Sequence, residues 1–272
     1  MTSRDVGGHA ARFDRLVGRS LLLKVVLFVA ALVTAVSTLA TAVVTIVEWN
    51  KSREDWRPAE YAKLGNLRAG QTLEHFRVVL GPPLYRETPP GSGFSYSTFR
   101  PRADYWVDVV SNADQVSVAF AVTSCSERFQ PAFRNRSVTG PVVLQRTRFT
   151  DVPENRETQV KAYDGMTSSS YAFLVLSLGN PSSYRSVAWG VNDTCAALAG
   201  QDEEQRLRPW ADWSGRKQPK GEINRSWSEF STSEREKLGR AEVNTYAETS
   251  PSTEIAKVFP QQVGVDRIVV RP

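Results

Sequence analysis

The residues of this chain best suited to chemistry are its two cysteines, Cys125 and Cys195. Neither belongs to a Cys-x-x-Cys motif or to a cysteine and histidine set with metal-ligand spacing. A lone pair in an exported domain most simply forms a disulfide, whereas in a cytoplasmic domain the two would be unrelated buried thiols. The sequence therefore predicts a Cys125–Cys195 disulfide for a domain outside the cytoplasm, and it leaves the thiol alternative open.

Histidines and nucleophile motifs offer little for catalysis. The chain has two histidines, His9 near its start and His75 in a short amphipathic segment, where a surface or capping position is expected. The sequence contains no phosphate-binding loop, nucleophile elbow or His-Glu-x-x-His motif. Ser214 and Lys217 have the Ser-x-x-Lys spacing that could activate a nucleophile, but this pattern is expected by chance among so many serines and basic residues.

The charged residues give no sign of a catalytic or nucleic-acid site. Acids at 202–204, and Glu234 with Glu236, lie in charged stretches, where carboxylates are normally solvated. The net charge is +5, and acids are interleaved with the arginines instead of leaving one basic face. We therefore assign no catalytic, cofactor-binding or metal-binding residue and expect no nucleic-acid partner.

An apolar segment at residues 25–47 is the strongest organisational signal. Its 23 residues carry no charge, which at 1.5 Å per residue is enough to cross a hydrocarbon layer of about 30 Å. Lys24 and Trp49 flank it, where a snorkelling lysine and an interfacial tryptophan are expected. We expect a retained transmembrane helix in contact with membrane lipid. A cleaved signal peptide is the alternative, because residues 40–42 have the small-x-small form, although its apolar core would be unusually long.

Basic residues flank this segment almost equally, so they do not fix its orientation. Those before it are Arg4, Arg12, Arg15, Arg19 and Lys24, and those close behind it are Lys51, Arg53, Arg57 and Lys63. A short N-terminal tail usually stays in the cytoplasm, and the cysteine pair favours an oxidising space for the domain. We expect a single-pass protein of the cell membrane, with a cytoplasmic N-terminus and an extracytoplasmic domain.

The chain divides into five expected parts. They are a basic N-terminal tail at 1–24, the transmembrane helix at 25–47, a stalk helix at 48–69, an α+β domain at 70–199 and a C-terminal extension at 200–272. The extension holds Trp210, Trp213 and Trp227 in an otherwise polar stretch, and tryptophan is costly to expose without a role. We expect it to pack on the domain, to add a closing strand at 263–270, and to offer these tryptophans as partner contacts.

Residues 70–124 carry the clearest local pattern. Thr72 is placed to cap a short helix and Gly81, followed by a proline, to end it. The apolar face of this helix is Leu73, Phe76, Val79 and Leu80. Three alternating runs then predict an antiparallel meander at 94–99, 103–110 and 115–124. Less clear segments follow: a strand at 142–149, a buried strand or short helix at 171–178, and an alternating run at 184–191.

The expected fold class is therefore α+β, with one N-terminal transmembrane helix and then a helix packed on an antiparallel sheet. The capped helix ending in Leu-Gly-Pro-Pro83 and its meander resemble the small envelope domains of the outer-membrane-protein assembly lipoproteins and the β-lactamase-inhibitor-like fold. This likeness covers residues 70–124, and the lipobox cysteine of those lipoproteins is absent. It implies a role in binding proteins.

A looser likeness covers most of the chain. Segments such as Asn-Pro-Ser-Ser-Tyr184, Trp-Gly-Val-Asn-Asp193 and Val-Asn-Thr-Tyr246 resemble a group of uncharacterised bacterial single-pass membrane proteins, which implies an anchor and no known activity. We expect a membrane-anchored envelope protein whose domain binds a protein, a second copy of itself or a cell-envelope component. The alternatives are a membrane-bound enzyme with an unrecognised site and a cytoplasmic-facing sensor or defence protein. An enzyme should gather titratable groups in one cleft, and a binding module should not.

Overall fold

The computed structural model describes residues 28–29, 55–134, 140–151, 158–163, 171–178, 185–195, 223–259 and 263–266. The chain forms two compact units, residues 1–56 and 57–272, and the second is called the domain below. Apart from Phe28 and Val29, the expected transmembrane segment 25–47 lies outside the described residues, as do Lys24 and Trp49. In the parts of the chain that are described, no helix has the length and apolar character needed to cross a membrane.

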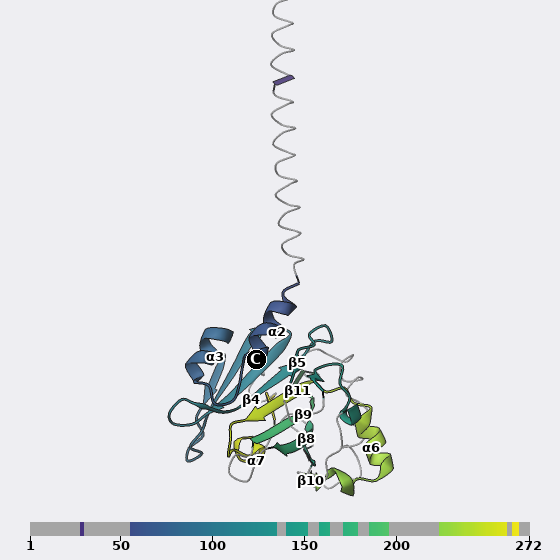
Figure 1. The fold of residues 1–272 in the computed structure, drawn as a ribbon. Coiled ribbons are helices and arrows are strands. Elements are labelled where there is room, and N and C mark those ends of the chain that lie inside the picture. Colours follow the sequence, from purple (N-terminus) through teal and green to yellow (C-terminus); the bar gives the residue numbers. More distant parts are fainter. Residues whose placement is uncertain are drawn as a thin grey trace, which may run out of the picture. The chain divides into compact units, whose positions relative to one another are not determined.

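A nine-stranded sheet forms the centre of the domain (Figure 1). Its order is β1-β2-β3-β4-β11-β9-β8-β7-β10, and all neighbours are antiparallel. The strands are β1 (Tyr85–Glu87), β2 (Ser95–Arg102), β3 (Tyr105–Ser111), β4 (Ser117–Ser124), β7 (Gln159–Tyr163), β8 (Tyr171–Leu178), β9 (Arg185–Asn192), β10 (Ile223–Ser226) and β11 (Thr245–Thr249). A separate small sheet pairs β5 (Ala132–Phe133) with β6 (Val142–Val143).

The helices are short. They are α2 (Arg57–Gly65), α3 (Leu73–Leu80), α6 (Thr232–Gly239) and α7 (Ile255–Val258), with 3-10 turns η1 (Phe149–Asp151) and η2 (Trp227–Glu229). Helix α3 confirms its prediction: the Thr72 hydroxyl accepts the His75 N–H, and Gly81 ends the helix at a φ of 88°, which favours glycine. Helix α2 buries Glu60 and Leu64, so this part of the expected stalk packs on the domain.

The expected α+β fold class is wrong. The described structure is mostly antiparallel sheet with a few short helices. Strands β7, β10 and β11 are short and partly polar, and the sequence gives them no clear alternation. The strand expected at 142–149 covers only Val142–Val143, and residues 263–266 of the expected closing strand are not in a strand.

Different parts of the chain cover the two faces of the sheet. The first, called the helix face, carries Tyr105, Phe120 and Tyr246, and Phe76 of α3 packs on Phe120. The other, called the tail face, carries Trp106, Asp108, Ala121 and Ala247. It is covered by residues 255–259 and 263–266, together called the C-terminal segment. Residues of that segment packed on the sheet are Ile255, Val258, Phe259, Val263 and Val265. Because both faces are covered, β3 is buried along its whole length.

Small side chains let the C-terminal segment come close to the tail face. Ala119, Ala121, Ala188 and Ala247 belong to its buried cluster. Gly190 lies beside Ala172 and Phe173 of β8, and even a methyl group there would overlap backbone atoms. The segment is then held by polar bonds, since the Asn192 side chain donates to the carbonyl oxygens of Val263 and Val265 at 3.0 and 2.9 Å.

Cys125 and Cys195 form a disulfide, as predicted, with their Cα atoms 5.0 Å apart. Cys125 follows β4 and Cys195 lies three residues after β9. These two strands flank β11 on either side. The disulfide therefore ties together the ends of the two strands that hold β11.

Candidate functional site

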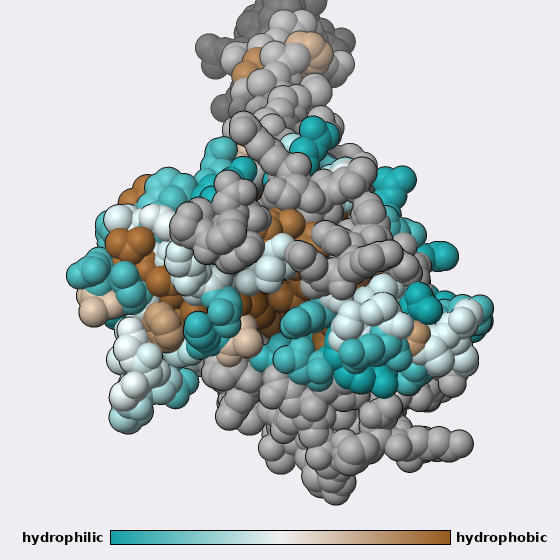
Figure 2. Space-filling model, turned by 60° about the horizontal axis from the view of Figure 1, so that its bottom comes forward, coloured by the Kyte–Doolittle hydropathy of each residue, from teal (hydrophilic) through white to brown (hydrophobic). Residues whose placement is uncertain are grey.

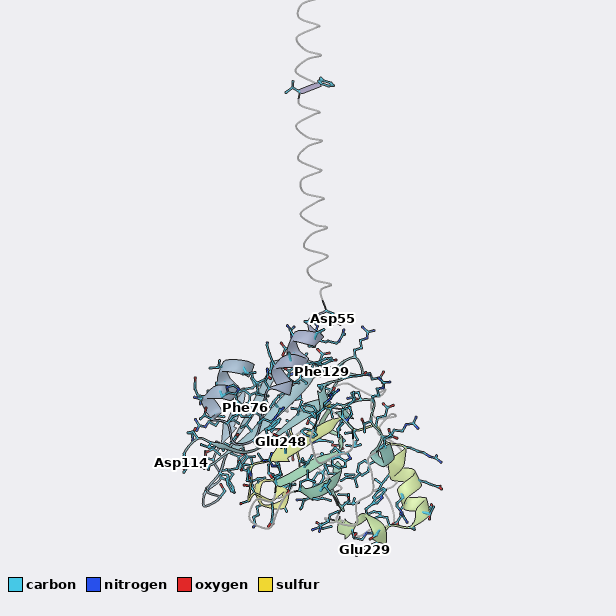
Figure 3. All side chains as sticks on the ribbon, in the orientation of Figure 1. Asp55, Phe76, Asp114, Phe129, Glu229 and Glu248 are labelled. Carbon is cyan, nitrogen blue, oxygen red and sulfur yellow. A yellow bond between two sulfur atoms is a disulfide. The ribbon has the colours of Figure 1, made fainter. Side chains whose placement is uncertain are left out.

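A small pocket lies on the helix face, between the end of α2, strand β5 and strand β11. Its volume is about 220 Å³. The lining residues are Gly65, Arg68, Ala132, Phe133, Arg134, Tyr246 and Glu248. Figure 3 shows Glu248 in the middle of the domain, on β11. Three segments far apart in the sequence thus supply the lining, and only the completed sheet brings them together.

Tyr246 and Glu248 form the inner part of the pocket. They lie two residues apart on β11 and so share a face of the sheet. The Tyr246 ring is buried and stacks on Phe133, with the ring centroids 4.4 Å apart and the planes 5° from parallel. Its hydroxyl donates to Glu248 Oε2 at 3.0 Å, and the Ala69 N–H donates to Oε1 at 3.1 Å. Two neutral donors therefore hold the Glu248 carboxylate, which is 9% exposed, in one orientation.

Arg68 and Arg134 bring two positive charges to the rim of the pocket. Both side chains are exposed. Arg68 follows α2, where its backbone N–H donates to Gln71 Oε1 at 2.8 Å and its guanidinium donates to the Leu67 carbonyl oxygen. Neither arginine forms an ion pair within the described part of the chain. Their guanidinium groups therefore keep donors available for a ligand.

The lining is suited to recognition. It combines two cations, one buried carboxylate and an aromatic pair, and a planar guanidinium matches the two oxygens of a carboxylate or phosphate. None of its seven residues is a serine, cysteine or histidine, so the lining does not place a nucleophile beside a base. The arrangement can bind an anionic group and orient what is attached to it.

Glu60 is a second buried carboxylate, and its role is structural. It accepts a hydrogen bond from the Tyr105 hydroxyl at 2.6 Å, which fixes α2 to β3, and one from Lys63 of the same helix at 2.7 Å. Burial raises the pKa of Glu60, but the hydrogen bonds from Lys63 and Tyr105 and the charges of Lys63 and Arg102 outweigh burial and hold it below its ordinary value. Burial and the bond to Glu60 raise the pKa of Tyr105.

Asp108 lies on the tail face, away from the pocket. Thr98 donates its hydroxyl to Oδ1, whereas Oδ2 has no hydrogen-bond partner among the described residues. Burial raises the pKa of Asp108 to about 7; the bond from Thr98 lowers it and the charge of Asp266 raises it further. Asp266 of the C-terminal segment thus lies close enough for its charge to act on Asp108.

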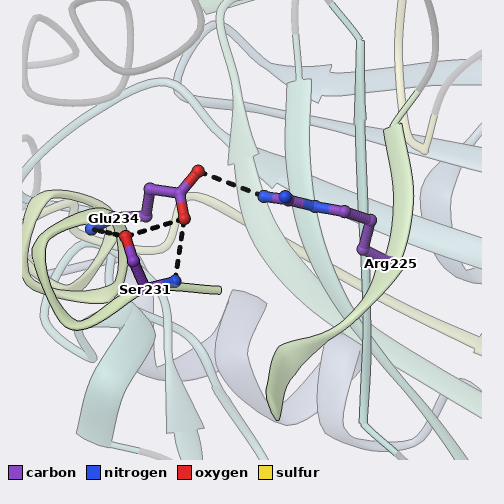
Figure 4. Close-up of polar contacts among 3 residues, drawn as sticks. All are labelled: Arg225, Ser231 and Glu234. Carbon is purple, nitrogen blue, oxygen red and sulfur yellow. Dashed lines mark hydrogen bonds and ion pairs between the residues drawn. The ribbon is translucent and has the colours of Figure 1, made fainter. Parts of the chain in front are cut away.

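Glu234, one of the acids weighed for acid–base chemistry, caps helix α6 (Figure 4). The Ser231 N–H and hydroxyl both donate to its Oε2 at 2.8 Å, and Arg225 donates to Oε1 at 3.2 Å. Burial raises the pKa of Glu234, but the bonds from Ser231 and Arg225 outweigh burial and lower it. Ser231 and Glu234 thus form a capping box, and the carboxylate serves the fold.

The predicted partner contacts are only partly described. Trp227 is 4% exposed and packs near Phe149 and Phe230, with ring centroids 6.2 and 5.9 Å away, so it belongs to the core and offers no surface contact. Trp210 and Trp213 lie outside the described residues. His75 is exposed on α3, as expected.

Apolar side chains also reach the surface elsewhere on the domain. Figure 2 shows hydrophobic residues in the middle of one face, between areas of hydrophilic residues. Val78 on α3, with Leu84 and Tyr85 at the start of β1, are the most exposed large apolar side chains of the described domain. Their exposed fractions are 76%, 54% and 36%. Unlike the lining of the pocket, these three side chains carry no charge.

Sequence reasoning missed every residue of the pocket. The signal that could have pointed to it is the Tyr246-x-Glu248 spacing, which places an aromatic ring and a carboxylate on one face of a strand.

No known protein family, curated protein or solved structure matches the chain. The likeness of residues 70–124 to envelope domains therefore stays a prediction, and function has to be argued from the pocket and the disulfide.

Proposed function

We propose that this chain is an extracytoplasmic binding module, held at the cell membrane by its apolar segment 25–47, and that its pocket recognises a protein or a cell-envelope component. One observation carries the proposal: Arg68 and Arg134, from separate segments, meet at a pocket with a buried carboxylate and an aromatic pair. Arginine and tyrosine are enriched where binding energy is concentrated. Because these exposed guanidinium groups form no ion pair with any described residue, they can engage an anion without first breaking such a pair.

The disulfide supports a location in an oxidising space, because disulfides persist there and are rare in the cytosol. It also bears on the pocket. Cys125 and Cys195 tie the ends of β4 and β9, between which β11 supplies Tyr246 and Glu248. Binding is tighter when the binding groups are already in position before the ligand arrives. The disulfide contributes to this preorganisation, because it restrains the strands on both sides of β11.

Photo-crosslinking from the pocket tests the binding role. A benzophenone amino acid replaces Ala132, an exposed lining residue, in the full chain in cells. The matched control carries it at Glu229, which is exposed at η2, far from Glu248 in Figure 3. We expect a discrete adduct from position 132 that Arg134→Gln weakens, and none from 229. Equal adducts from both positions, or none from 132, would refute binding at this pocket.

The compartment is tested separately by thiol alkylation. Whole cells are quenched in acid and the protein is labelled with a polyethylene glycol maleimide before and after reduction. We expect no label before reduction and two labels on Cys125 and Cys195 after it. Full labelling before reduction would place the domain in a reducing space and overturn the extracytoplasmic location.

A further inference from the structure

We infer that the pocket binds the free C-terminal end of a peptide chain, with its carboxylate at Arg68 and Arg134 and its last amide N–H at Glu248. The inference rests on the proposed function and names the chemistry of the ligand. It uses the three charged groups of the lining together, which neither a simple anion nor a simple cation does.

The charges of the lining favour a monoanion. Arg68 and Arg134 contribute two positive charges and Glu248 one negative charge, so the lining carries a net +1. A single carboxylate makes the occupied pocket neutral. A cation at Glu248 would share the pocket with two guanidinium groups, and a dianion would add a second negative charge to a lining that already holds the Glu248 carboxylate. Each guanidinium can donate two parallel hydrogen bonds to one carboxylate.

Glu248 adds a requirement for a hydrogen-bond donor next to that anion. Its oxygens accept from Ala69 and Tyr246, and because a carboxylate has about four acceptor sites, capacity for a ligand remains. The group is almost fully buried, so an approaching ligand that offered only oxygen would meet repulsion. The last residue of a peptide offers a carboxylate on one side of its Cα atom and an N–H on the other, and capture of a C-terminal carboxylate is a recurrent mode of peptide recognition.

The size of the pocket limits how much of the peptide enters. Its volume of about 220 Å³ is below the ~300–1,000 Å³ of pockets that enclose a drug-sized ligand. It therefore accepts the end of a longer molecule, while the rest of the chain stays outside. The stacked rings of Phe133 and Tyr246 form the apolar part of the lining, beside the terminal side chain.

Fluorescence anisotropy on the full-length protein in detergent micelles tests the inference. The probes are a labelled Gly-Ser-Gly-Ser-Ala-Ala peptide with a free C-terminus and the same peptide ending in an amide. We expect the free carboxylate to bind about tenfold tighter or more, since hydrogen bonds to a charged group contribute ~1.5–3 kcal/mol. Arg68→Gln and Arg134→Gln should each weaken binding of the free-carboxylate peptide about tenfold. The matched control Arg240→Gln, at another exposed arginine, should leave binding unchanged.

Three results would overturn the inference. The first is equal affinity for the two peptides, and the second is binding that neither pocket arginine affects. The third is equally tight binding of an amidated peptide with one internal aspartate, which would show that the pocket accepts any carboxylate. In each case the photo-crosslinking experiment at position 132 tests the proposed function separately, because a crosslinked adduct can form with any ligand of the pocket.

Discussion

Replacing Asp108 by asparagine should stabilise this protein at neutral and alkaline pH. Asp108 is 9% exposed, and the tail face and the C-terminal segment surround it with Ala121, Trp106 and Asp266. Ionisation therefore places a charge where water is scarce and another carboxylate is near. Asparagine has nearly the same shape, can still accept the Thr98 hydroxyl through its side-chain oxygen, and carries no charge.

The direction of the pKa shift of Asp108 determines whether the free energy of unfolding rises or falls with pH. The folded pKa of Asp108 is raised to about 7 from an ordinary value of 3.8, so between these values the folded state holds a proton that the unfolded state has lost. The stability of the wild-type protein therefore falls as pH rises from 3.8 to about 7 and is then level. At about 1.4 kcal/mol for each pH unit of this interval, the ionised group lowers the free energy of unfolding by at most about 4 kcal/mol.

Urea unfolding of the full chain in micelles, followed by tryptophan fluorescence, measures this difference. Asp108→Asn and the wild-type protein should have similar midpoints near pH 4, and the variant should be more stable by about 2–4 kcal/mol at pH 8. Asp114→Asn is the matched control, because Asp114 is exposed at the β3–β4 turn and lies at the edge of the domain in Figure 3. Equal stability at pH 8, or a less stable Asp108→Asn, would refute the argument that burial and Asp266 disfavour the charge.

Three further changes test the fold that carries the pocket. Replacing Cys125 and Cys195 by serine should lower the free energy of unfolding by about 4 kcal/mol in the chain-entropy model, and reductant should then have no effect on the urea midpoint. Gly190→Ala would push a methyl group into the backbone of β8, so we expect a loss of more than about 3 kcal/mol or no folded protein; Gly65→Ala, with no atom within 4 Å of its new methyl group, should change the midpoint little. Glu234→Ala, which removes the side-chain acceptor of the capping box, should cost about 1 kcal/mol, and an unchanged midpoint would contradict that role.

Local signals in the sequence predicted the locally formed parts of the fold. Helix α3 has its cap, its apolar face and its terminating glycine within ten residues of each other. Strands β2, β3 and β4 are joined by short turns, so the alternation within each strand and the turn residues between them sufficed. Strand β8 coincides with the segment 171–178, for which a helix had been the alternative. In each case the residues that determine the structure are neighbours in sequence.

Parts that depend on distant pairing were not predictable in this way. Strand β11 pairs with β4 and β9, and its Tyr246 lies opposite Val122 and Trp189. Five residues with a glutamate among them give no strand signal when taken alone. The C-terminal extension at 200–272 is expected to pack on the domain, but its sequence does not indicate which face it covers. The C-terminal segment covers the tail face, where Asp108 is buried. Covering by a distant segment changes the environment of a residue without changing its local pattern.

The position of β11 explains why the candidate site and the hardest element to predict coincide. It lies between two meanders, β2-β3-β4 and β7-β8-β9, each of which can form from neighbouring strands. Without β11, the edges of β4 and β9 would be left unpaired, and such edges invite aggregation. Contacts of long sequence separation form late because loop closure costs entropy first. Tyr246 and Glu248 therefore reach the pocket only when both meanders are in place, and the Cys125–Cys195 disulfide, which joins the ends of β4 and β9, then holds them there.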